Sequence, residues 1–345
     1  MRDFSALIKN WYLQNRRNLP WRATNDPYKI WLSEIILQQT RVEQGMSYYL
    51  KFIEHYPTVK DLAEATEDEV LKDWQGLGYY SRARNLHAAA KYIHNELEGK
   101  FPTTYKEILQ LKGVGEYTAS AISSIVFGLP KAVVDGNVYR VLSRLLNEDT
   151  PIDTTQGKKL FVEAAQELLD ENDPSTHNQA VMELGALVCT PKNPDCDNCP
   201  VWEKCLSYEK GTQLTLPVKS KKTKVTRRFL HYFLLLCDEH LLIRKRGTND
   251  IWRGLYDFPV MELPADREPT KSELKQFNIT SVTEDGQFKH VLSHQHIFAQ
   301  FWMAEVHSLP EIENSIRVHI NDLDSYPMPR LLIRYLESSQ QFAGD

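Results

Sequence analysis

Four of the five cysteines lie within seventeen residues, and this spacing constrains the fold more than any other feature of the chain. Cys189, Cys196, Cys199 and Cys205 follow the pattern C-x6-C-x2-C-x5-C. Four thiolates so close together can hold a tetrahedral metal ion or a cubane cluster. Zinc is the generic alternative, but zinc sites usually show two CxxC pairs, and here there is one. The fifth cysteine, Cys237, lies in an apolar, strand-like run and is expected in the core.

Disulfides are not expected, because no basic and apolar signal segment is seen at the N-terminus. We therefore expect a cytoplasmic protein. Hydrophobic content of 42% and charged content of 25% are those of a soluble globular protein, and no apolar run reaches the roughly 20 residues of a membrane span. A length of 345 residues is enough for two domains.

The stretch Leu111–Val141 predicts a turn that can face a phosphate. Gly113 and Gly115 form a tight turn before the expected helix Tyr117–Phe127, so that backbone N–H groups at the helix start point outward. Taken alone, such a glycine pair is more often a plain connector between two helices.

A carboxylate follows this expected helix. After the Gly128–Pro130 helix stop and a short strand-like piece, Ala132–Val134, the chain presents Asp135 and Asn137 before another helix. Asp135 can cap that helix or serve a cleft.

Three further segments carry polar or aromatic groups in places that suit nucleic acid. Trp21 and Arg22 follow a helix stop and look exposed; they can pack over the core, or stack on and hydrogen-bond a purine. The polar run Gln38–Val42 could enter DNA or merely cap a helix. Tyr79 and Tyr80, beside two arginines, suit either a stacking platform or an ordinary helix junction.

The expected helix, with Asp26 as its N-cap and Pro27 at its first position, contains one carboxylate, Glu34, among large apolar residues. Periodicity alone directs Glu34 to solvent. The alternative is a cleft, where desolvation would raise its pKa toward neutrality.

The second half of the chain changes character after the cysteines. A basic run from Lys219 to Arg228 holds six positive charges in ten residues, although the whole chain carries a net charge of −5. Beyond it, period-two patterns predict paired strands at Phe229–Cys237 and His240–Arg244, and another strand at Phe298–Val306. This indicates a smaller α+β domain after a linker.

Taken together, these motifs resemble the endonuclease III superfamily of base-excision glycosylases. LxGVGxYTA followed by VxDGNVxRV is similar to the helix-hairpin-helix and catalytic aspartate of that superfamily, and the cysteine spacing is the one of its [4Fe–4S] loop. The C-terminal half resembles the MutY-type adenine glycosylases, in which a linker leads to a Nudix-like domain. Ile251–Pro259 looks like the WxGLYxFP element of that domain, and His290–His294 like its mismatch-sensing loop. No Nudix hydrolase box is present.

The resemblance implies a mainly α catalytic region, made of a helix-hairpin-helix six-helix barrel and an iron–sulfur helical domain, followed by an α+β Nudix-like domain. The expected boundaries are 1–206 for the glycosylase region, with the barrel at about 22–127 and the iron–sulfur domain at 1–21 and 128–206. A linker at 207–226 and a lesion-recognition domain at 227–345 complete the chain.

Site residues carry over position by position from the resemblance. Glu34 is similar to the general acid that protonates adenine N7, and Asp135 to the carboxylate that stabilises the oxocarbenium-like sugar, with Tyr117 and Asn137 in support. Residues expected around the flipped adenine are Trp21, Arg22, Leu37 and Gln179. Residues expected to contact DNA or 8-oxoguanine are Gln39, Thr40, Tyr79, Gly113, Gly115, Ser293 and His294.

Position 117 separates two types of enzyme within the superfamily. Its bifunctional members place a Schiff-base lysine there, and this chain has tyrosine. We therefore expect a monofunctional enzyme that removes adenine opposite 8-oxoguanine or guanine in double-stranded DNA, acting as a monomer. The alternatives are a glycosylase-lyase for oxidised pyrimidines and a non-catalytic iron–sulfur DNA-binding protein. Leu292 replaces the aromatic residue usual in the sensing loop, and Lys112 the proline usual in the hairpin.

Overall fold

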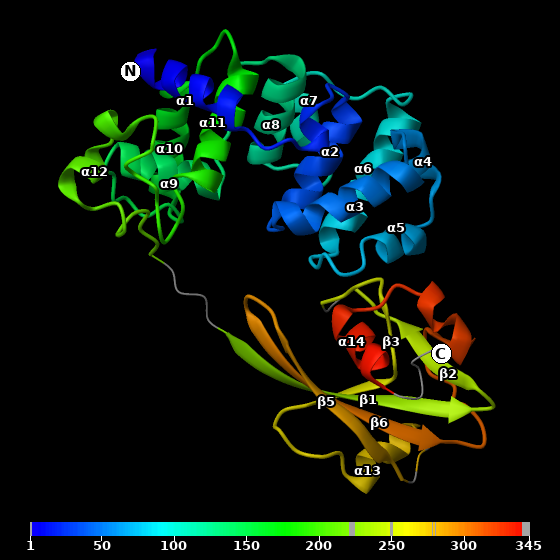
Figure 1. Ribbon diagram of the computed structural model, residues 1–345. Coiled ribbons are helices and arrows are strands. Elements are labelled where there is room, and N and C mark those ends of the chain that lie inside the picture. The colour runs from blue at the N-terminus through cyan, green and yellow to red at the C-terminus, as the bar shows by residue number, and fades with distance from the viewer. Residues whose placement is uncertain (1, 221–224, 249–250, 278, 280, 340–345) are drawn as a thin grey trace. The chain divides into compact units, whose positions relative to one another are not determined.

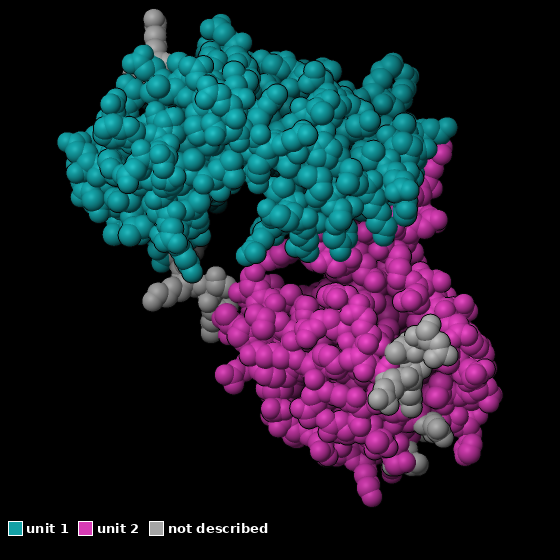
Figure 2. Space-filling model, viewed as in Figure 1, with its two compact units in different colours: residues 1–63, 88–222 teal, residues 64–87, 223–345 magenta. Residues whose placement is uncertain are grey.

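The computed structural model describes residues 2–220, 225–248, 251–277, 279 and 281–339. Its contacts divide the chain into two compact units, Met1–Ala63 with Ala88–Lys222, and Glu64–His87 with Thr223–Asp345 (Figure 2). The division at 222 falls inside the predicted linker. The sequence did not predict that Glu64–His87 would group with the C-terminal residues. Of the basic run, residues 221–224 lie outside the described part of the chain.

The first unit is helical (Figure 1). Its helices are α1 (Arg2–Asn15), α2 (Pro27–Leu37), α3 (Val42–His55), α4 (Val59–Glu64), α7 (Tyr105–Gln110), α8 (Glu116–Phe127), α9 (Gly136–Leu145), α10 (Thr155–Leu168), α11 (Pro174–Leu187) and α12 (Leu206–Lys210). Short 3-10 turns form at Pro20–Arg22 and Trp202–Lys204. Helix α5 (Glu67–Asp73) belongs to the second unit, and α6 (Ser81–Glu96) crosses the division between the two.

Local sequence explains where the helices nearest the predicted site begin and end. Asp26 caps α2 by accepting the Tyr28 N–H at 2.9 Å, and Pro27 occupies its first turn, as predicted. Gly128 ends α8 in a left-handed conformation, with φ of 62°. Asp135 caps α9 by accepting the Val138 N–H at 2.7 Å.

The prediction of a strand-like piece at Ala132–Val134 is wrong, because this segment pairs with no strand in the described part of the chain. Side chains take the place of a partner strand. The Ala132 N–H donates to Gln166 Oε1 at 3.0 Å, and the Val133 N–H donates to Asn178 Oδ1 at 3.1 Å. These bonds fix the segment that delivers Asp135 to the start of α9.

Two buried clusters of apolar side chains position these helices. Helices α1, α9, α10 and α11 share one core, built around Ile8, Leu142, Phe161 and Leu184. Helices α2, α3, α7 and α8 pack in the pairs α2 with α3, α2 with α8 and α7 with α8. Helix α11 also contacts α8, so residues of α2, α8, α9 and α11 can face a common space. Across the described residues, none of the helices is both long and apolar enough to span a membrane.

The second unit is built on a seven-stranded sheet. Its strands are β1 (Thr226–Cys237), β2 (His240–Lys245), β3 (Tyr256–Asp257), β4 (Val260–Leu263), β5 (Thr283–Val291), β6 (Gln295–Glu305) and β7 (Ser315–His319), with helices α13 (Lys271–Leu274) and α14 (Arg330–Ser338). The order is β3-β2-β1-β6-β5, with β4 paired to β1 and β7 paired to β2. Strands β1 and β6 run parallel, and the other pairs are antiparallel. The three predicted strands are therefore confirmed.

Each face of this sheet buries its own core. One face packs Tyr232 and Phe301 against α14 residues such as Tyr335, and the other packs Phe233 and Trp302 against Phe277. Cys237 is a correction to the sequence prediction: it is partly exposed, because it ends β1 at the tight turn into β2.

Candidate active site

The first unit contains a cavity of about 190 Å³ that gathers most of the predicted catalytic and adenine-contacting residues. The predicted residues on its wall are Trp21, Arg22, Glu34, Leu37, Thr40, Tyr117, Asp135, Asn137 and Gln179. They come from α2, α8, α11, the start of α9 with its N-cap, the turn before α2 and the segment between α2 and α3. Glu34 and Asp135, about a hundred positions apart in the sequence, thus face one space.

Glu34 lies on the wall of this cavity rather than on the solvent face that periodicity suggested. Desolvation raises the pKa of its carboxyl to about 7, and a hydrogen bond from Tyr117 opposes part of that rise. The nearby Asp135 charge raises the pKa of Glu34 further, and Arg22 lowers it. A carboxyl with a pKa near neutrality can be protonated before a reaction and give up its proton during one.

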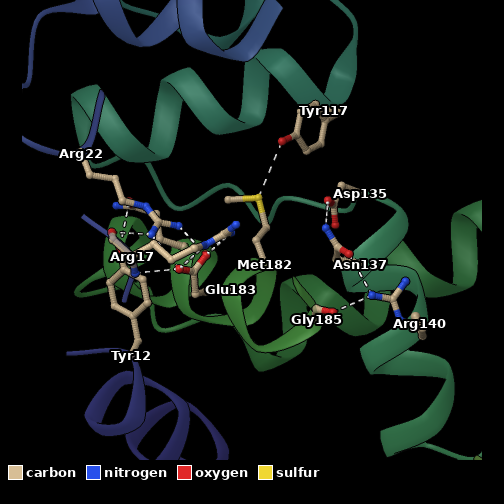
Figure 3. A network of polar contacts seen from close by, with 11 residues as sticks. Tyr12, Arg17, Arg22, Tyr117, Asp135, Asn137, Arg140, Met182, Glu183 and Gly185 are labelled. Atoms are coloured by element: carbon tan, nitrogen blue, oxygen red, sulfur yellow. Dashed lines mark hydrogen bonds and ion pairs between the residues drawn. The ribbon is translucent and has the colours of Figure 1, made fainter. Parts of the chain in front are cut away.

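Asp135 differs from Glu34 because each of its carboxylate oxygens accepts a hydrogen bond from an N–H group. Asn137 Nδ2 donates to Oδ2 at 2.9 Å (Figure 3). The Val138 N–H donates to Oδ1 at 2.7 Å. Burial raises the pKa of Asp135 above its usual value, and these hydrogen bonds and the Arg140 guanidinium offset only part of that rise. Asn137 is held in turn by Arg140, whose Nη2 donates to Asn137 Oδ1 at 2.8 Å and to the Gly185 carbonyl at 2.6 Å.

Tyr117 interacts electrostatically with both carboxyl groups. Burial raises the pKa of its phenol well above the usual value, and the charges of Glu34 and Asp135 add to this rise. The phenol is therefore neutral. Its hydroxyl lies 3.6 Å from Met182 Sδ (Figure 3), and its single proton can be donated either to that sulfur or to the Glu34 carboxyl. No lysine is found among the described residues that line the cavity.

A buried ion-pair cluster forms one wall, and sequence reasoning missed it. Glu183, with 1% of its side chain exposed, accepts from Arg22 Nη2 at 2.8 Å and Arg17 Nη2 at 2.7 Å. Burial raises the pKa of Glu183, but hydrogen bonds from the two arginines outweigh it and hold the pKa at about 2. Glu183 follows Gln179 by four positions on α11, so helical spacing from a predicted site residue could have found it.

Neighbouring aromatic residues hold three of the other residues that we expect around the adenine, Trp21, Gln179 and Arg22. Trp21 is buried rather than exposed, because its ring packs edge-on against Tyr49 at 5.2 Å. Gln179 Oε1 accepts from the Tyr12 hydroxyl at 3.0 Å, and the Arg22 guanidinium lies 5.4 Å above the Tyr12 ring.

Two predicted DNA-contacting features lie outside this cavity. Gln39 is exposed and has a left-handed backbone, with φ of 56°, which is uncommon for a residue other than glycine. Gly113 has φ of 83°, and Gly115 precedes α8 without a side-chain cap, which leaves the first N–H groups of the helix open.

The predicted lesion-sensing residues meet in the second unit. The hydroxyls of Tyr79 and Ser293 are 2.9 Å apart, and both residues line a cavity of about 730 Å³ together with His294, Leu292 and Trp252. Tyr79 is 47% exposed and has φ of 48°. Residues 292–294 form the turn between β5 and β6.

The four clustered cysteines occupy one neighbourhood. Burial raises the pKa of the Cys199 thiol to about 12, and the charges of Cys189, Cys205 and Cys196 raise it further. Arg144, 2% exposed, donates to Cys189 Sγ at 3.3 Å and to the Thr190 carbonyl at 2.8 Å. Four thiolates that repel one another need a cationic centre, so the donor set fits an iron–sulfur cluster chemically.

Among the described residues, no three His, Cys, Asp or Glu side chains are arranged around a common point as a single metal ion requires. A cubane differs in this respect, because each cysteine binds a different corner iron and the four sulfurs lie farther apart than the ligands of a single ion.

Comparisons with known proteins agree with this geometry. Residues 32–168 match the model of the HhH-GPD superfamily of base excision DNA repair proteins, and residues 231–338 match a NUDIX domain. An adenine DNA glycosylase of Buchnera aphidicola subsp. Baizongia pistaciae is 35% identical over 84% of this chain and 83% of that relative. The adenine DNA glycosylase of Homo sapiens is 42% identical over 61% of this chain and 40% of its own length.

Solved structures support the same assignment for the helical part. A thermostable thymine-DNA glycosylase covers 60% of this chain and 95% of its own, with a TM-score of 0.56 and 32% identity. Endonuclease III in a non-covalent DNA complex covers 61% of this chain and 96% of its own; its TM-score is 0.53 and its identity 21%, so it shows the fold alone. The predicted fold class is confirmed, and the chain belongs to the adenine DNA glycosylase family within the HhH-GPD superfamily of base excision DNA repair proteins.

Proposed function

We propose that this protein is a monofunctional glycosylase that removes adenine mispaired with 8-oxoguanine or guanine in double-stranded DNA. The observation that carries the proposal is the pair Glu34 and Asp135 on one cavity wall, one carboxyl with a pKa near 7 and the other with N–H donors on both oxygens. Cleavage of a glycosidic bond needs one acid and one carboxylate at the same pH.

In this proposal Glu34 protonates adenine N7 and makes the base a better leaving group. Asp135 stabilises the positive charge that develops on the sugar, and water completes the reaction. Asn137 keeps Asp135 oriented, and the neutral Tyr117 phenol orients Glu34. The base must leave the duplex to reach this enclosed site, with Trp21, Arg22, Leu37 and Gln179 around it.

The absence of a lyase step follows from the nucleophiles available. Strand cleavage by a glycosylase-lyase requires an amine that attacks the sugar. Tyr117 stands at the position of that amine, and its buried phenol is neutral. The product would be an abasic site.

DNA contacts are assigned to features outside the cavity. Gly113 and Gly115, at the open start of α8, would face a phosphate, and Gln39 with Thr40 would enter the duplex beside the flipped base. The left-handed backbone of Gln39 and Tyr79 supports a contact role, because such strain persists where function requires it. Ser293 and His294 would read 8-oxoguanine with Tyr79.

Cys189, Cys196, Cys199 and Cys205 would hold a [4Fe–4S] cluster. The bound cluster would supply a cross-link that orders the loop 189–205 and a redox-active centre. Arg144 would fasten this loop to α9 through its bonds to Cys189 and Thr190.

The test is a single-turnover assay with adenine placed opposite 8-oxoguanine, guanine or thymine, with products separated before and after alkali. We expect strand breaks only after alkali and only in the first two duplexes. Breaks without alkali would establish a lyase. Protein with its cluster intact that cleaves none of the duplexes would favour the non-catalytic DNA-binding alternative.

A further inference from the structure

A second cavity in the C-terminal unit belongs to none of the sites described so far. It has a volume of about 270 Å³ and opens on one face of strands β1, β6 and β5. Its lining mixes aromatic and polar side chains: Phe229, His231, Asp266, Gln287, Lys289, Phe298 and Gln300, with Phe288 and Ala299 between them along the strands.

Strand pairing places these side chains in two adjacent rows. Phe229 pairs with Phe298, which pairs with Lys289 across β1, β6 and β5. One step further along the same face, His231 pairs with Gln300, which pairs with Gln287. An aromatic row thus lies beside a hydrogen-bonding row, the combination that a flat ring with a polar edge requires.

The aromatic row presents ring surface with a cation. The Phe229 and Phe298 rings stack at 5.3 Å with an interplanar angle of 20°, and Lys289 Nζ lies 5.4 Å from the Phe298 ring centre. Both phenylalanines are only partly buried, in contrast to Phe233 further along β1, which is fully buried. An open aromatic pair on adjacent strands is a surface on which bases stack.

Two side chains of the hydrogen-bonding row, Gln300 and His231, can form further hydrogen bonds. Gln300 Oε1 is buried and has no hydrogen-bond partner among the described residues, although a buried amide oxygen normally has one. His231 Nδ1 accepts from Trp302 Nε1 at 3.1 Å, so the proton of the neutral ring is on Nε2, which can donate. The amide and the imidazole together offer donors and acceptors to one planar edge.

The charges at this face fit a phosphate beside the ring. Lys289 and Arg227 are exposed, and Arg227 lies two residues before Phe229 on the same face of β1. Asp266, on the rim, is the one carboxylate among the residues that line this cavity in the described structure, and it can accept from an exocyclic amine.

We propose that this face of the Nudix-like domain is a binding site for one unpaired nucleotide, with the base against Phe298, its edge at Gln300 and His231, and its phosphate at Lys289. The ligand can come from a single strand of DNA or from a free nucleotide. This site is separate from Ser293 and His294, and it does not depend on the glycosylase chemistry.

The test uses the full-length protein with its cluster and a short single strand carrying 5-iododeoxyuridine, which crosslinks to stacked aromatic residues under ultraviolet light. We expect the crosslinked peptides to contain Phe298 or Phe229. Phe298→Leu, which keeps apolar volume but removes the ring, should weaken binding of the strand at this site about tenfold, as the loss of one base stack does. Lys289→Gln should also weaken it, and Lys271→Gln, an exposed lysine on α13, should not.

Two further measurements complete the test. One distinguishes a single strand from a free nucleotide as the ligand, and the other shows whether the variant is folded. Crosslinking that dAMP or dTMP suppresses identifies free nucleotides as ligands, and crosslinking that resists them identifies the strand; either result supports the site. Unchanged melting temperatures and unchanged adenine excision from duplex DNA in Phe298→Leu would show that the unit is folded and that the catalytic proposal stands independently. Crosslinks confined to other peptides, or equal strand binding by wild type and Phe298→Leu, would overturn the proposal.

Discussion

Two carboxyl groups in one cavity differ in their immediate neighbours, although burial raises the pKa of both. Glu34 is desolvated, and a hydrogen bond from the Tyr117 phenol offsets only part of this effect, so its pKa rises to about 7. Asp135 has the Val138 N–H and the Asn137 amide at 2.7 and 2.9 Å, and these bonds favour its ionised form. The hydrogen bonds to Asp135 therefore favour its role as a carboxylate, and the desolvation of Glu34 favours its role as an acid.

The pH dependence of adenine release tests this difference. Glu34 must carry a proton to act as an acid, and it is protonated below its pKa, so the single-turnover rate should fall as the pH rises through about 7. Glu34→Gln should bind the mismatch but release adenine at least about a hundredfold more slowly, the lower range for the loss of a general acid. Wild-type release by Glu34→Gln, or a rate that stays flat from pH 6 to about pH 9, would remove Glu34 from the mechanism.

Glu183 takes no part in the proposed reaction, but it holds Arg17 and Arg22 in place on the cavity wall. Its pKa of about 2 lies below the ordinary glutamate value, so its charge stabilises the fold above that ordinary value, and the stabilisation is lost as the pH falls toward 2. Glu183→Gln leaves Arg17 and Arg22 without a counter-charge, and removing one partner of a buried ion pair costs about 3–5 kcal/mol. We expect a clearly lower melting temperature at neutral pH and slower adenine release.

The control for this variant is Glu163→Gln. Glu163 forms only an exposed pair with Lys159 at 3.8 Å, so its loss should change the melting temperature little. Equal effects of the two substitutions would contradict the role assigned to Glu183.

At the scale of elements, the start of α9 connects the candidate active site to the cysteine loop. Arg140, on the first turns of α9, donates to Asn137 in the cavity and to the Cys189 carbonyl at 2.6 Å. One turn later, Arg144 donates to Cys189 Sγ and to the Thr190, Pro191 and Leu216 carbonyls. One helix thus orders both the carboxylate end of the cavity and the loop that would hold the cluster.

Arg144 provides a test of this connection. Arg144→Gln removes the cation and most of its donors from a buried position, so loop 189–205 should loosen. We expect the visible absorption of the purified protein's cluster to fall to less than half per chain. Arg317→Gln, an exposed arginine on β7, is the matched control. Full cluster content in Arg144→Gln would show that the cysteines order the loop without help.

The elements show where sequence reasoning was sufficient. Helices α2 and α8 were predictable because Asp26, Pro27 and Gly128 mark their ends locally. The conformation of Ala132–Val134 was not, because its hydrogen-bond partners, Gln166 and Asn178, lie on distant helices. Glu34 was misdirected by periodicity for the same kind of reason: a cavity inside a helical bundle is a tertiary feature, and only the family resemblance pointed to it.

At the scale of the whole molecule, residues 64–87 belong to the same unit as the C-terminal sheet. Asp68 accepts from Lys245 Nζ at 2.6 Å and from the Tyr256 hydroxyl at 3.0 Å, and Arg84 donates to the Arg253 carbonyl at 2.6 Å. No local pattern reveals such pairings, since their partners are remote in sequence. Deleting the C-terminal residues would also strip residues 64–87 of these partners, so point substitutions give the cleaner test of lesion reading.

Ser293→Ala removes the hydroxyl that lies 2.9 Å from the Tyr79 hydroxyl. Loss of one hydrogen bond costs about 0.5–1.5 kcal/mol, so excision opposite 8-oxoguanine should slow by about two- to tenfold. Excision opposite guanine should change less, and Ser272→Ala, on the exposed face of α13, should change neither. Equal slowing with both partner bases would contradict a role for Ser293 in reading the oxidised base.

The grouping of residues 64–87 with the C-terminal sheet also bears on synthesis. These residues are synthesised before residues 88–222, and their partners on β2 and β3 are synthesised only after those. Because chains are made from the N-terminus and domains fold as units, α5 with buried Leu71, and Trp74 directly after it, must wait without their final neighbours. A growing chain of this protein therefore presents an apolar segment that a chaperone can recognise until the last unit is complete.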